Sequence, residues 1–259
     1  MVKKEIVDIL LNPYNGDGLS IKDNNALTDS NGNIIPFNND IPNFLSLEQT
    51  TGLNKKYQSF YDKISRLNDL AEFVYGIFYD LNKLRSEWMS DVEVKPEWKV
   101  LETSIGTGWN IKVLPDNAVY FGLDISQGML RQCQRNKKKW KREIELFQGN
   151  AEYLPFKSQT FDSVFHVGGI NFFNDRKRAI EEMIRVAKPR TKIVIIDETE
   201  ERIAKQYRNT PFIGKYFKDE DIDKARTVAP VSLVPQTMNE VAVKLLDRGK
   251  MYQLSFRTP

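Results

Sequence analysis

The pattern of hydrophobic and polar positions divides the chain into three regions. Residues 1–50 are rich in Asn, Asp, Gly and Pro, which predicts turns and short strands. Residues 51–92 carry large apolar side chains at helical spacing, among them Phe60, Ile64 and Leu67, and are predicted to be helical. Residues 93–259 alternate short β-like runs with amphipathic segments. That alternation indicates an α/β domain with a parallel sheet and helical crossovers.

The third region contains five runs that are typical of strands. The expected strands are Trp98–Thr103, Ala118–Leu123, Ile144–Gln148, Phe161–Val167 and Lys192–Asp197. Helices are expected from about Trp109, from Ser126 to about Arg142, and from Asp175 to about Ala187. Ser126 and Asp175 are expected to act as N-caps. Residues 240–256 are predicted to form an antiparallel hairpin that ends the sheet.

The composition narrows the class of protein. Of 259 residues, 41% are hydrophobic and 28% charged, which excludes a disordered, collagen-like or coiled-coil chain. The net charge of +3 indicates no broad nucleic-acid or membrane footprint. The longest apolar stretch, residues 71–81, is too short for a membrane span, and no signal peptide is recognised. Cys133 is the only cysteine, so no internal disulfide or cysteine zinc cluster can form. We expect a soluble, cytoplasmic protein without a metal.

A glycine-containing turn lies where the first expected strand meets the first helix. Glu102, Gly106 and Gly108 belong to this turn, where glycine permits positive φ and close approach of a ligand to the backbone. Asp124 ends the second expected strand, where a carboxylate can accept both hydroxyl protons of a ribose. Ligands of open α/β sheets bind outside the carboxyl ends of the strands. The pattern indicates a nucleotide-type site, and an ordinary tight turn is the alternative.

Further motifs follow this turn in a fixed order. They read ETSIGTG, GLD, GNAEYLPF, FDSV and RVAKPRT. Together they resemble the motifs of the class I S-adenosylmethionine (SAM)-dependent methyltransferases, in the type 11 group that includes the enzymes of ubiquinone and menaquinone biosynthesis. The resemblance covers residues 93–200. It implies a Rossmann-like, doubly wound, seven-stranded sheet and SAM as cofactor, with S-adenosylhomocysteine (SAH) as product.

The resemblance also assigns residues to the cofactor. The turn from Glu102 to Gly108 would hold the methionine part of SAM, and Asp124 would bind the ribose hydroxyls. Ile125 and Met129 would pack near the adenine, whose edge Asn150 would meet through its amide oxygen. The implied cofactor-binding set is Glu102, Thr103, Ser104, Gly106, Gly108, Asp124, Ile125, Met129, Asn150, Ala151, Glu152, His166, Val167, Tyr57 and Tyr61.

Three residues depart from the family motifs. Ser104 replaces the first glycine of the turn, and Arg190 and Thr191 replace a pair of glycines after Lys188-Pro189.

His166, the only histidine, is predicted to line the cleft as a general base. A packed residue with no proton role is the alternative, because many methyltransferases need no dedicated base.

The N-terminal segment resembles a zinc ribbon that has lost its metal. Asn12, Asn15, Thr28 and Asn31 occupy the four ligand positions, and such neutral groups are poor zinc ligands beside thiolates. Similar segments precede ribosomal-RNA guanine methyltransferases. An ordinary irregular extension is the alternative. The predicted division is a metal-free ribbon-like segment at 1–50, a helical lead-in covering the active site at 51–92, and a SAM-binding methyltransferase domain at 93–259.

Four functions are compatible with these patterns. The leading prediction is methyl transfer from SAM to a small-molecule acceptor through an O, N, S or C atom. The alternatives are an RNA methyltransferase, a non-catalytic cofactor-binding or interaction protein, and a nicotinamide-dependent oxidoreductase. A nucleic-acid partner is not indicated, because the basic run 131–142 is predicted to be a solvated helix face. Residues 211–224 are a candidate lid, and the oligomeric state is left open.

Overall fold

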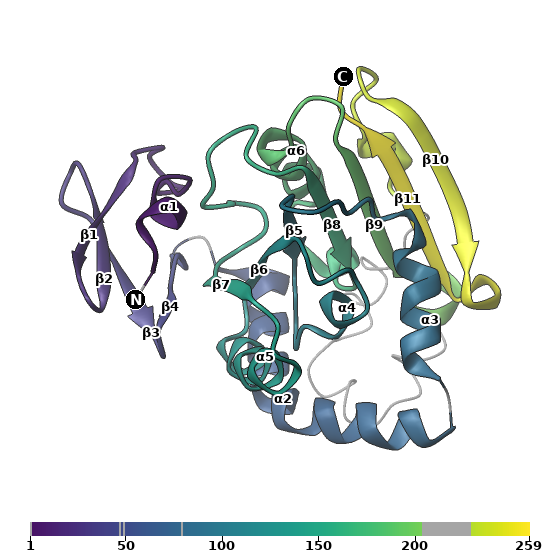
Figure 1. The fold of residues 1–259 in the computed structure, drawn as a ribbon. Coiled ribbons are helices and arrows are strands. Elements are labelled where there is room, and N and C mark those ends of the chain that lie inside the picture. The colour runs from purple at the N-terminus through teal and green to yellow at the C-terminus, as the bar shows by residue number, and fades with distance from the viewer. Residues whose placement is uncertain (1, 47, 49, 79, 204–228) are drawn as a thin grey trace.

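A computed structural model describes residues 2–46, 48, 50–78, 80–203 and 229–259, with the side chains of 66–78 excepted. Its main sheet has seven strands in the order β10-β11-β9-β8-β5-β6-β7. The strands are β5 (Lys99–Thr103), β6 (Val119–Asp124), β7 (Ile144–Gln148), β8 (Ser163–Val167), β9 (Lys192–Glu198), β10 (Asn239–Leu246) and β11 (Met251–Arg257). The first five are parallel, and the terminal hairpin is antiparallel (Figure 1). The predicted fold class and hairpin are therefore confirmed, with strand limits differing by one or two residues.

Helices cover both faces of this sheet. They are α2 (Gly52–Phe78), α3 (Leu81–Trp88), α4 (Trp109–Lys112), α5 (Gln127–Trp140) and α6 (Arg176–Val186). Both predicted N-caps are confirmed, because Ser126 Oγ accepts the N–H of Met129 at 3.1 Å and Asp175 accepts that of Arg178 at 2.9 Å. The helix expected from Trp109 is a single turn, since the chain reaches Pro115 two residues after its C-cap.

Alternation along the strands builds a separate core on each face. Leu101 points into a cluster shared with α6 and the N-terminal segment, whereas its neighbour Val100 points into a cluster shared with α4 and α5. Cys133 on α5 is buried, and the lysines of the basic run are half-buried or exposed, as expected of a solvated face. Both faces of the parallel strands are thus buried, which explains why KIVIID is almost continuously apolar.

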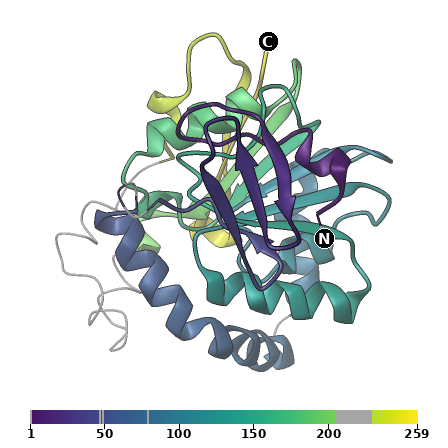
Figure 2. The ribbon, with the colours of Figure 1, turned by 90° about the vertical axis from the view of Figure 1, so that its left-hand side faces the viewer.

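The N-terminal segment forms a second sheet beside the β7 edge of the first. It contains α1 (Lys4–Val7), β1 (Leu19–Asp23), β2 (Ala26–Asp29), β3 (Ile34–Asn38) and β4 (Ile41–Pro42). The N–H of Phe44 donates to the carbonyl of Gln148 at 2.8 Å, and its ring joins the core that includes Phe147. Apolar residues of this segment, among them Phe44, thus pack on the main domain, and Figure 2 shows the segment beside it.

The lead-in helix α2 is held to the start of α5. Asp62 accepts hydrogen bonds from Ser126 Oγ at 2.7 Å and from the N–H of Gly128 at 2.8 Å. A Cβ on Gly128 would lie 2.6 Å from Ser65 Oγ, so only glycine lets the two helices approach this closely. Among the described residues no helix is both long and apolar enough to cross a membrane. Cytoplasmic localisation stays a prediction, and the candidate lid lies outside the described residues.

Candidate active site

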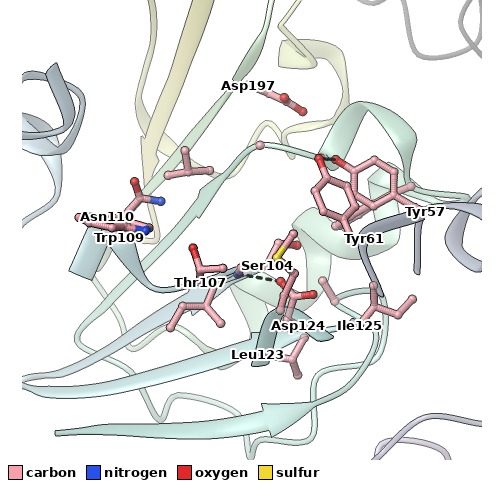
Figure 3. A pocket seen from close by; sticks show the side chains of 18 of the residues that line it. Tyr57, Tyr61, Ser104, Thr107, Trp109, Asn110, Leu123, Asp124, Ile125 and Asp197 are labelled. Atoms are coloured by element: carbon pink, nitrogen blue, oxygen red, sulfur yellow. Dashed lines mark hydrogen bonds between the residues drawn. The ribbon is translucent and has the colours of Figure 1, made fainter. Parts of the chain in front are cut away.

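A cavity of about 470 Å³ lies at the carboxyl ends of the central strands, beneath α2 and α3. Its wall includes the turn after β5, Asp124 at the end of β6, the end of β8 and Asp197 on β9. Figure 3 shows these groups facing one open space. The chain order reverses direction between β6 and β8 on either side of β5, and this switch point is where open α/β sheets bind ligands.

The turn after β5 has a left-handed backbone at three positions. The φ angles of Ser104, Gly106 and Gly108 are 66°, 56° and 85°. Ser104, the departure from the family motif, therefore keeps the conformation that favours glycine. Arg190, the other departure with such a backbone, has a φ of 63°. A Cβ on Gly108 would lie 2.8 Å from Cys133 Sγ, so this glycine permits packing of α5 rather than contact with the cavity.

Asp124 lies in the cavity wall and is held by backbone donors. Its Oδ2 accepts the N–H of Gly106 at 2.8 Å, and its Oδ1 accepts that of Ser126 at 2.8 Å. Burial raises the pKa of this carboxyl to about 6, and the backbone hydrogen bonds oppose the rise. Near neutral pH the group is mainly ionised and presents acceptor oxygens to the cavity, as a ribose diol requires.

Glu102, the acid of the family motif, lies behind the wall instead. Its Oε1 accepts Asn110 Nδ2 at 2.7 Å, and its Oε2 has no hydrogen-bond partner among the described residues. Burial is the largest cause that raises the pKa of Glu102 to about 8. The sequence analysis did not identify Asn110. This residue lines the cavity, and its amide lies between the cavity and the buried carboxyl of Glu102.

The structure separates the predicted cofactor residues into two groups. Those in the cavity wall are Tyr57, Tyr61, Ser104, Gly106, Asp124, Ile125, Met129, Asn150, Ala151 and Val167. Those behind it are Glu102, Thr103, Gly108, Glu152 and His166. Glu152 has a structural role there: its Oε1 accepts Asn54 Nδ2 at 2.8 Å and the N–H of Asp175 at 3.1 Å, which ties α2 to the start of α6.

His166 does not lie in the cleft wall where it was predicted. The ring is fully buried, its Nδ1 lies 3.0 Å from Thr103 Oγ1, and its Nε2 has no hydrogen-bond partner among the described residues. Burial lowers the pKa of the imidazole to about 4, so the ring is neutral at pH 7. Phe173, which does line the cavity, packs edge-on against it. The geometry therefore favours a packed His166 with no role in proton transfer, because an acceptor in the cavity does not reach the ring.

Asn150 differs in detail from its predicted role. Its Oδ1 already accepts the N–H of Glu152 at 3.0 Å, while its Nδ2 is buried without a partner among the described residues. The backbone donor determines which atom is oxygen, so the amide is not ambiguous here. The group without a partner is a donor, and a ring nitrogen of adenine is the natural acceptor for it.

The cavity also contains residues that sequence reasoning missed. Trp88 and Trp109 line it, and both indole N–H groups are buried without a partner among the described residues. The guanidinium of Arg85 lies 5.6 Å from the centre of the Trp109 ring. Because α3 turns back over the sheet only in the folded chain, no local pattern identifies Arg85 or Trp88 as cavity residues.

Asp197 is the other missed residue, and a signal for it existed. It follows the buried run KIVII and lies one residue before the carboxyl end of β9, whereas Asp124 is the last residue of β6. Its Oδ1 accepts the N–H of Glu198 at 2.7 Å, and its Oδ2 accepts that of Asn171 at 3.0 Å. Burial first, and then the neighbouring Glu198, raises the pKa of Asp197 to about 7.

The ribbon-like segment has a carboxylate at its centre. Asp29 Oδ2 accepts hydrogen bonds from Asn12 Nδ2 and Asn15 Nδ2 at 2.8 Å each and from Asn33 Nδ2 at 2.9 Å. Two of the four positions predicted to replace zinc ligands, Asn12 and Asn15, therefore donate side-chain hydrogen bonds to Asp29, whereas the hydroxyl of Thr28 donates to a backbone carbonyl. Among the described residues no group of three or more His, Cys, Asp or Glu could hold a metal.

Comparison with known proteins supports the resemblance seen in the sequence. The family model described as a methyltransferase domain matches residues 101–195. A demethylmenaquinone methyltransferase from Lysinibacillus sphaericus is 29% identical over 169 residues, which cover 64% of this chain and 70% of that protein. These matches support a class I SAM-dependent methyltransferase. A second demethylmenaquinone methyltransferase, from Bacillus cytotoxicus, is 32% identical over 151 residues, which cover 56% of this methyltransferase and 63% of that protein.

Solved structures agree on the fold of this methyltransferase. A SAM-dependent methyltransferase from Thermotoga maritima has a TM-score of 0.54 at 18% identity, covering 76% of this chain and 98% of that chain. The 4+2 cyclase SpnF has a TM-score of 0.51 at 13% identity, covering 70% and 80%. Identities this low show the fold alone, and the cyclase illustrates that the fold does not determine the reaction. The comparisons support the predicted family.

Proposed function

We propose that this chain transfers the methyl group of SAM to a small molecule, with a quinone-type acceptor as the first candidate. The observation that carries the proposal is the cavity at the switch point, where Asp124 faces a glycine turn with left-handed backbone. SAM supplies a methyl group on a positively charged sulfur, which leaves as a neutral thioether. The protein then has to bind, align and desolvate the two reactants.

The residues present fit this cofactor. Asp124 would accept the ribose hydroxyls, and Ile125 and Met129 would supply apolar surface to the adenine. Asn150 Nδ2 and Trp109 Nε1 are buried donors without partners among the described residues. Buried donors in proteins are normally hydrogen-bonded, and a bound ligand would supply the acceptors. A cavity of about 470 Å³ is within the usual range for small-molecule sites.

The acceptor candidate comes from the relatives and from the aromatic wall. The Lysinibacillus and Bacillus cytotoxicus relatives are named demethylmenaquinone methyltransferases, but the matched parts span only 70% and 63% of their lengths, so their substrate is a hypothesis for this chain. Phe60, Tyr57 and Phe173 line the cavity on the side of α2 and β8. Aromatic side chains in a cavity wall favour a flat, largely apolar acceptor. We also propose that the chain divides at residues 50 and 92. Residues 1–50 would then derive from a zinc ribbon that has lost its metal, and residues 51–92 would form the helical lead-in.

Calorimetric titration with SAM and SAH tests the proposal. Replacing Asp124 with Ala should weaken both ligands on the order of 100-fold, because hydrogen bonds from two hydroxyls to a charged group are lost. Asp116→Ala, an exposed carboxylate in the loop before β6, is the matched control and should change neither affinity. Absence of binding in the unaltered protein would contradict the proposal and favour the non-catalytic alternative.

Turnover is measured separately from binding. Tritiated methyl from SAM should enter reduced demethylmenaquinone in detergent, and purified RNA should stay unlabelled. Label in RNA but not in the quinol would instead favour the RNA methyltransferase alternative. Binding without transfer to either would refute the quinone acceptor while leaving the cofactor assignment intact.

A further inference from the structure

We propose that Asp197 accepts the proton released in methyl transfer, and that the acceptor is an aromatic molecule whose hydroxyl group binds between Asp197 and the hydroxyls of Tyr57 and Tyr61. This inference rests on the proposed function and deepens it, because it names the acceptor class and the base. It replaces the predicted role of His166, whose ring the cavity does not reach.

Asp197 lies on the acceptor side of the cavity. It lies one residue before the end of β9, the strand that pairs with β8, while the cofactor residues lie at the ends of β5 and β6. In Figure 3 it faces Ser104 and Thr107 across the open space, with the two tyrosines to one side. A SAM molecule held by the turn and Asp124 would therefore have Asp197 on its far side. An acceptor must occupy that space to meet the methyl group in line.

Backbone hydrogen bonds hold the Asp197 carboxylate without neutralising it. Glu198 N–H and Asn171 N–H each bind one oxygen, and a carboxylate oxygen has a second lone pair for another donor. No ion pair to Asp197 occurs in the described part of the chain, and Arg202 pairs with Glu198 at 2.8 Å instead. The carboxylate is only 2% exposed, so an acceptor hydroxyl in the cavity would compete little with water for it.

The tyrosine pair places two hydroxyl groups beside this carboxylate. Tyr57 Oη and Tyr61 Oη are 3.0 Å apart, and the Tyr57 ring stacks on Phe172 at 5.3 Å. A Cβ on Gly169 would lie 3.1 Å from Tyr57 Oη, so this glycine lets the hydroxyl settle on the loop after β8. Burial raises the pKa of Tyr61, and nearby Glu198 and Asp197 add to the rise, so the Tyr61 hydroxyl stays protonated. Such groups can orient a substrate oxygen by donating to it.

The electrostatics of the acceptor space select the kind of substrate. Asp197 and Glu198 are neighbouring carboxylates in the wall, and an anionic acceptor would have to bury a further negative charge against them. The aromatic wall favours a flat ring. A neutral ring hydroxyl satisfies both conditions, since it binds as an acid to a carboxylate. A hydroquinone belongs to this class.

The proposed step conserves atoms and charge. The hydroxyl O–H bond breaks, and its proton passes to Asp197. The released electron pair, on oxygen or on the ring carbon conjugated with it, forms the new bond to the methyl carbon. The bond from sulfur to methyl breaks and its pair stays on sulfur, which leaves neutral SAH. When carbon is methylated, the ring hydrogen then returns to oxygen as a proton, so either path releases one proton.

The decisive variants are Asp197→Asn and Asp197→Glu, with Asp175→Asn as matched control. Asp175 is an exposed carboxylate that caps α6 and touches no cavity, so its loss should leave methyl transfer unchanged. Asp197→Asn should keep SAH affinity within about threefold and slow single-turnover transfer to reduced demethylmenaquinone by at least about 100-fold. Asp197→Glu should restore part of the rate, because it keeps a carboxylate.

The pH profile separates a base from a structural residue. The unaltered protein should transfer methyl faster as the pH rises through about 7, since Asp197 must be ionised to accept a proton. The groups that face it are Glu198 on its own strand, Tyr61 on α2 and Tyr252 on β11. Both tyrosines have raised pKa values and stay neutral, so the charged groups nearby that can shift the midpoint are Glu198, its partner Arg202 in the cavity wall, and Arg176 beside Tyr252. Asp197→Asn should abolish this rise.

A second measurement does not depend on the acceptor. 4-Nitrophenol is titrated into the protein–SAH complex and followed by its phenolate absorbance. Asp197→Asn should weaken its binding at least about tenfold, because the bond from phenol to carboxylate is lost. Unchanged transfer and unchanged nitrophenol binding would overturn the inference while the proposed function stands. Loss of SAH binding in Asp197→Asn would also overturn it, whereas failure of the unaltered protein to bind SAH refutes the proposed function itself.

Discussion

Asp29 in the N-terminal sheet and Asp197 in the cavity are both buried carboxylates with opposite surroundings. Asp29 accepts five hydrogen bonds, three from side-chain amides and two from the backbone of Asn31 and Asn33. These bonds, that of Asn33 first, hold the pKa of Asp29 below its usual range. Asp197 is buried with fewer donors, and its pKa is raised instead. Burial and the number of donors together separate a carboxylate that stabilises the fold from one that can exchange a proton.

The same contrast extends to the other acids of the cavity. Glu102 has one oxygen without a partner among the described residues, and Asp124 has its pKa raised by burial. Groups buried with incomplete hydrogen bonding reduce the stability of the empty protein. They gain partners when a ligand enters. The N-terminal sheet differs, since the carboxylate at its polar centre has its hydrogen bonds without a ligand.

The largest effect is expected on breaking the Asp29 centre. Asp29→Ala leaves three amides without their shared acceptor, of which that of Asn12 is buried, and should lower the midpoint of thermal unfolding on the order of 10 °C. Asp23→Ala, an exposed turn residue of the same sheet, is the control and should change it by little. Differential scanning calorimetry measures both. An equal midpoint for Asp29→Ala and the unaltered protein would contradict a structural role.

Opposite pH dependences should separate the two regions. The Asp29 pKa is lowered in the folded state, so its stabilisation is present above the unfolded pKa and is lost as the pH falls below about 4. Asp197 and Asp124 have raised pKa values of about 7 and 6, so the folded state binds more protons than the unfolded one between about pH 4 and 7. Their contribution therefore falls as the pH rises through that window.

Denaturant unfolding from pH 3 to 8 tests these slopes. In Asp197→Asn, the free energy of unfolding should fall less as the pH rises toward neutral. In Asp29→Asn, it should fall less as the pH is lowered below about 4. The double variant should show both changes with little coupling, because the two sites are in different sheets. A single variant that altered both limbs would mean that the two regions unfold as one electrostatic unit.

Smaller effects are expected where the turn departs from glycine. A left-handed backbone costs an L residue about 1–2 kcal/mol, and glycine loses about 0.5–1 kcal/mol in added chain entropy. Ser104→Gly should therefore raise the free energy of unfolding by about 0.5 kcal/mol, and Arg190→Gly should do the same. Ser158→Gly, at a position without positive φ, is the control and should be neutral or destabilising. Destabilisation by Ser104→Gly would show that its side chain makes a compensating contact.

The smallest effect is expected on the methyl-transfer rate after replacing His166. His166→Gln should transfer methyl within about threefold of the unaltered rate, since the ring is neutral and lies behind the cavity wall. Its midpoint of thermal unfolding should fall, because a packed side chain is lost. A 100-fold slower transfer with unchanged SAH affinity would restore the predicted role of His166 as base.

Much of the fold could be predicted because its signals are local. Alternation along 98–103 and 192–197, the caps at Ser126 and Asp175, and the hairpin around Asp247–Gly249 each act through neighbours in the chain. The cofactor acid Asp124 was also predictable, because a carboxylate at the carboxyl end of a parallel strand meets the ligand crevice. The order of the five motifs then pointed to the family.

The same patterns did not tell which predicted residues face the cavity. Gly106 and Gly108 look alike in sequence, yet one lines the cavity and the other makes room for Cys133. His166 and Val167 are adjacent in β8, and the pleat turns only Val167 to the cavity wall. If β8 shifted by one residue along its neighbours, the buried residues and the cavity-facing residues would exchange sides. The register that prevents this shift is set by packing against the other strands.

The sequence by itself determined the α/β architecture, the methyltransferase family and the acid at the end of the second parallel strand, because each depends on residue type and local spacing. Tertiary structure alone decided the rest. It brought Arg85 and Trp88 of α3 over the cavity and buried Glu102 behind its wall. It also left Asp197 with few backbone donors while surrounding Asp29 with amides. Burial and the number of hydrogen-bond donors determine what a carboxylate does, and both arise only when distant segments pack together.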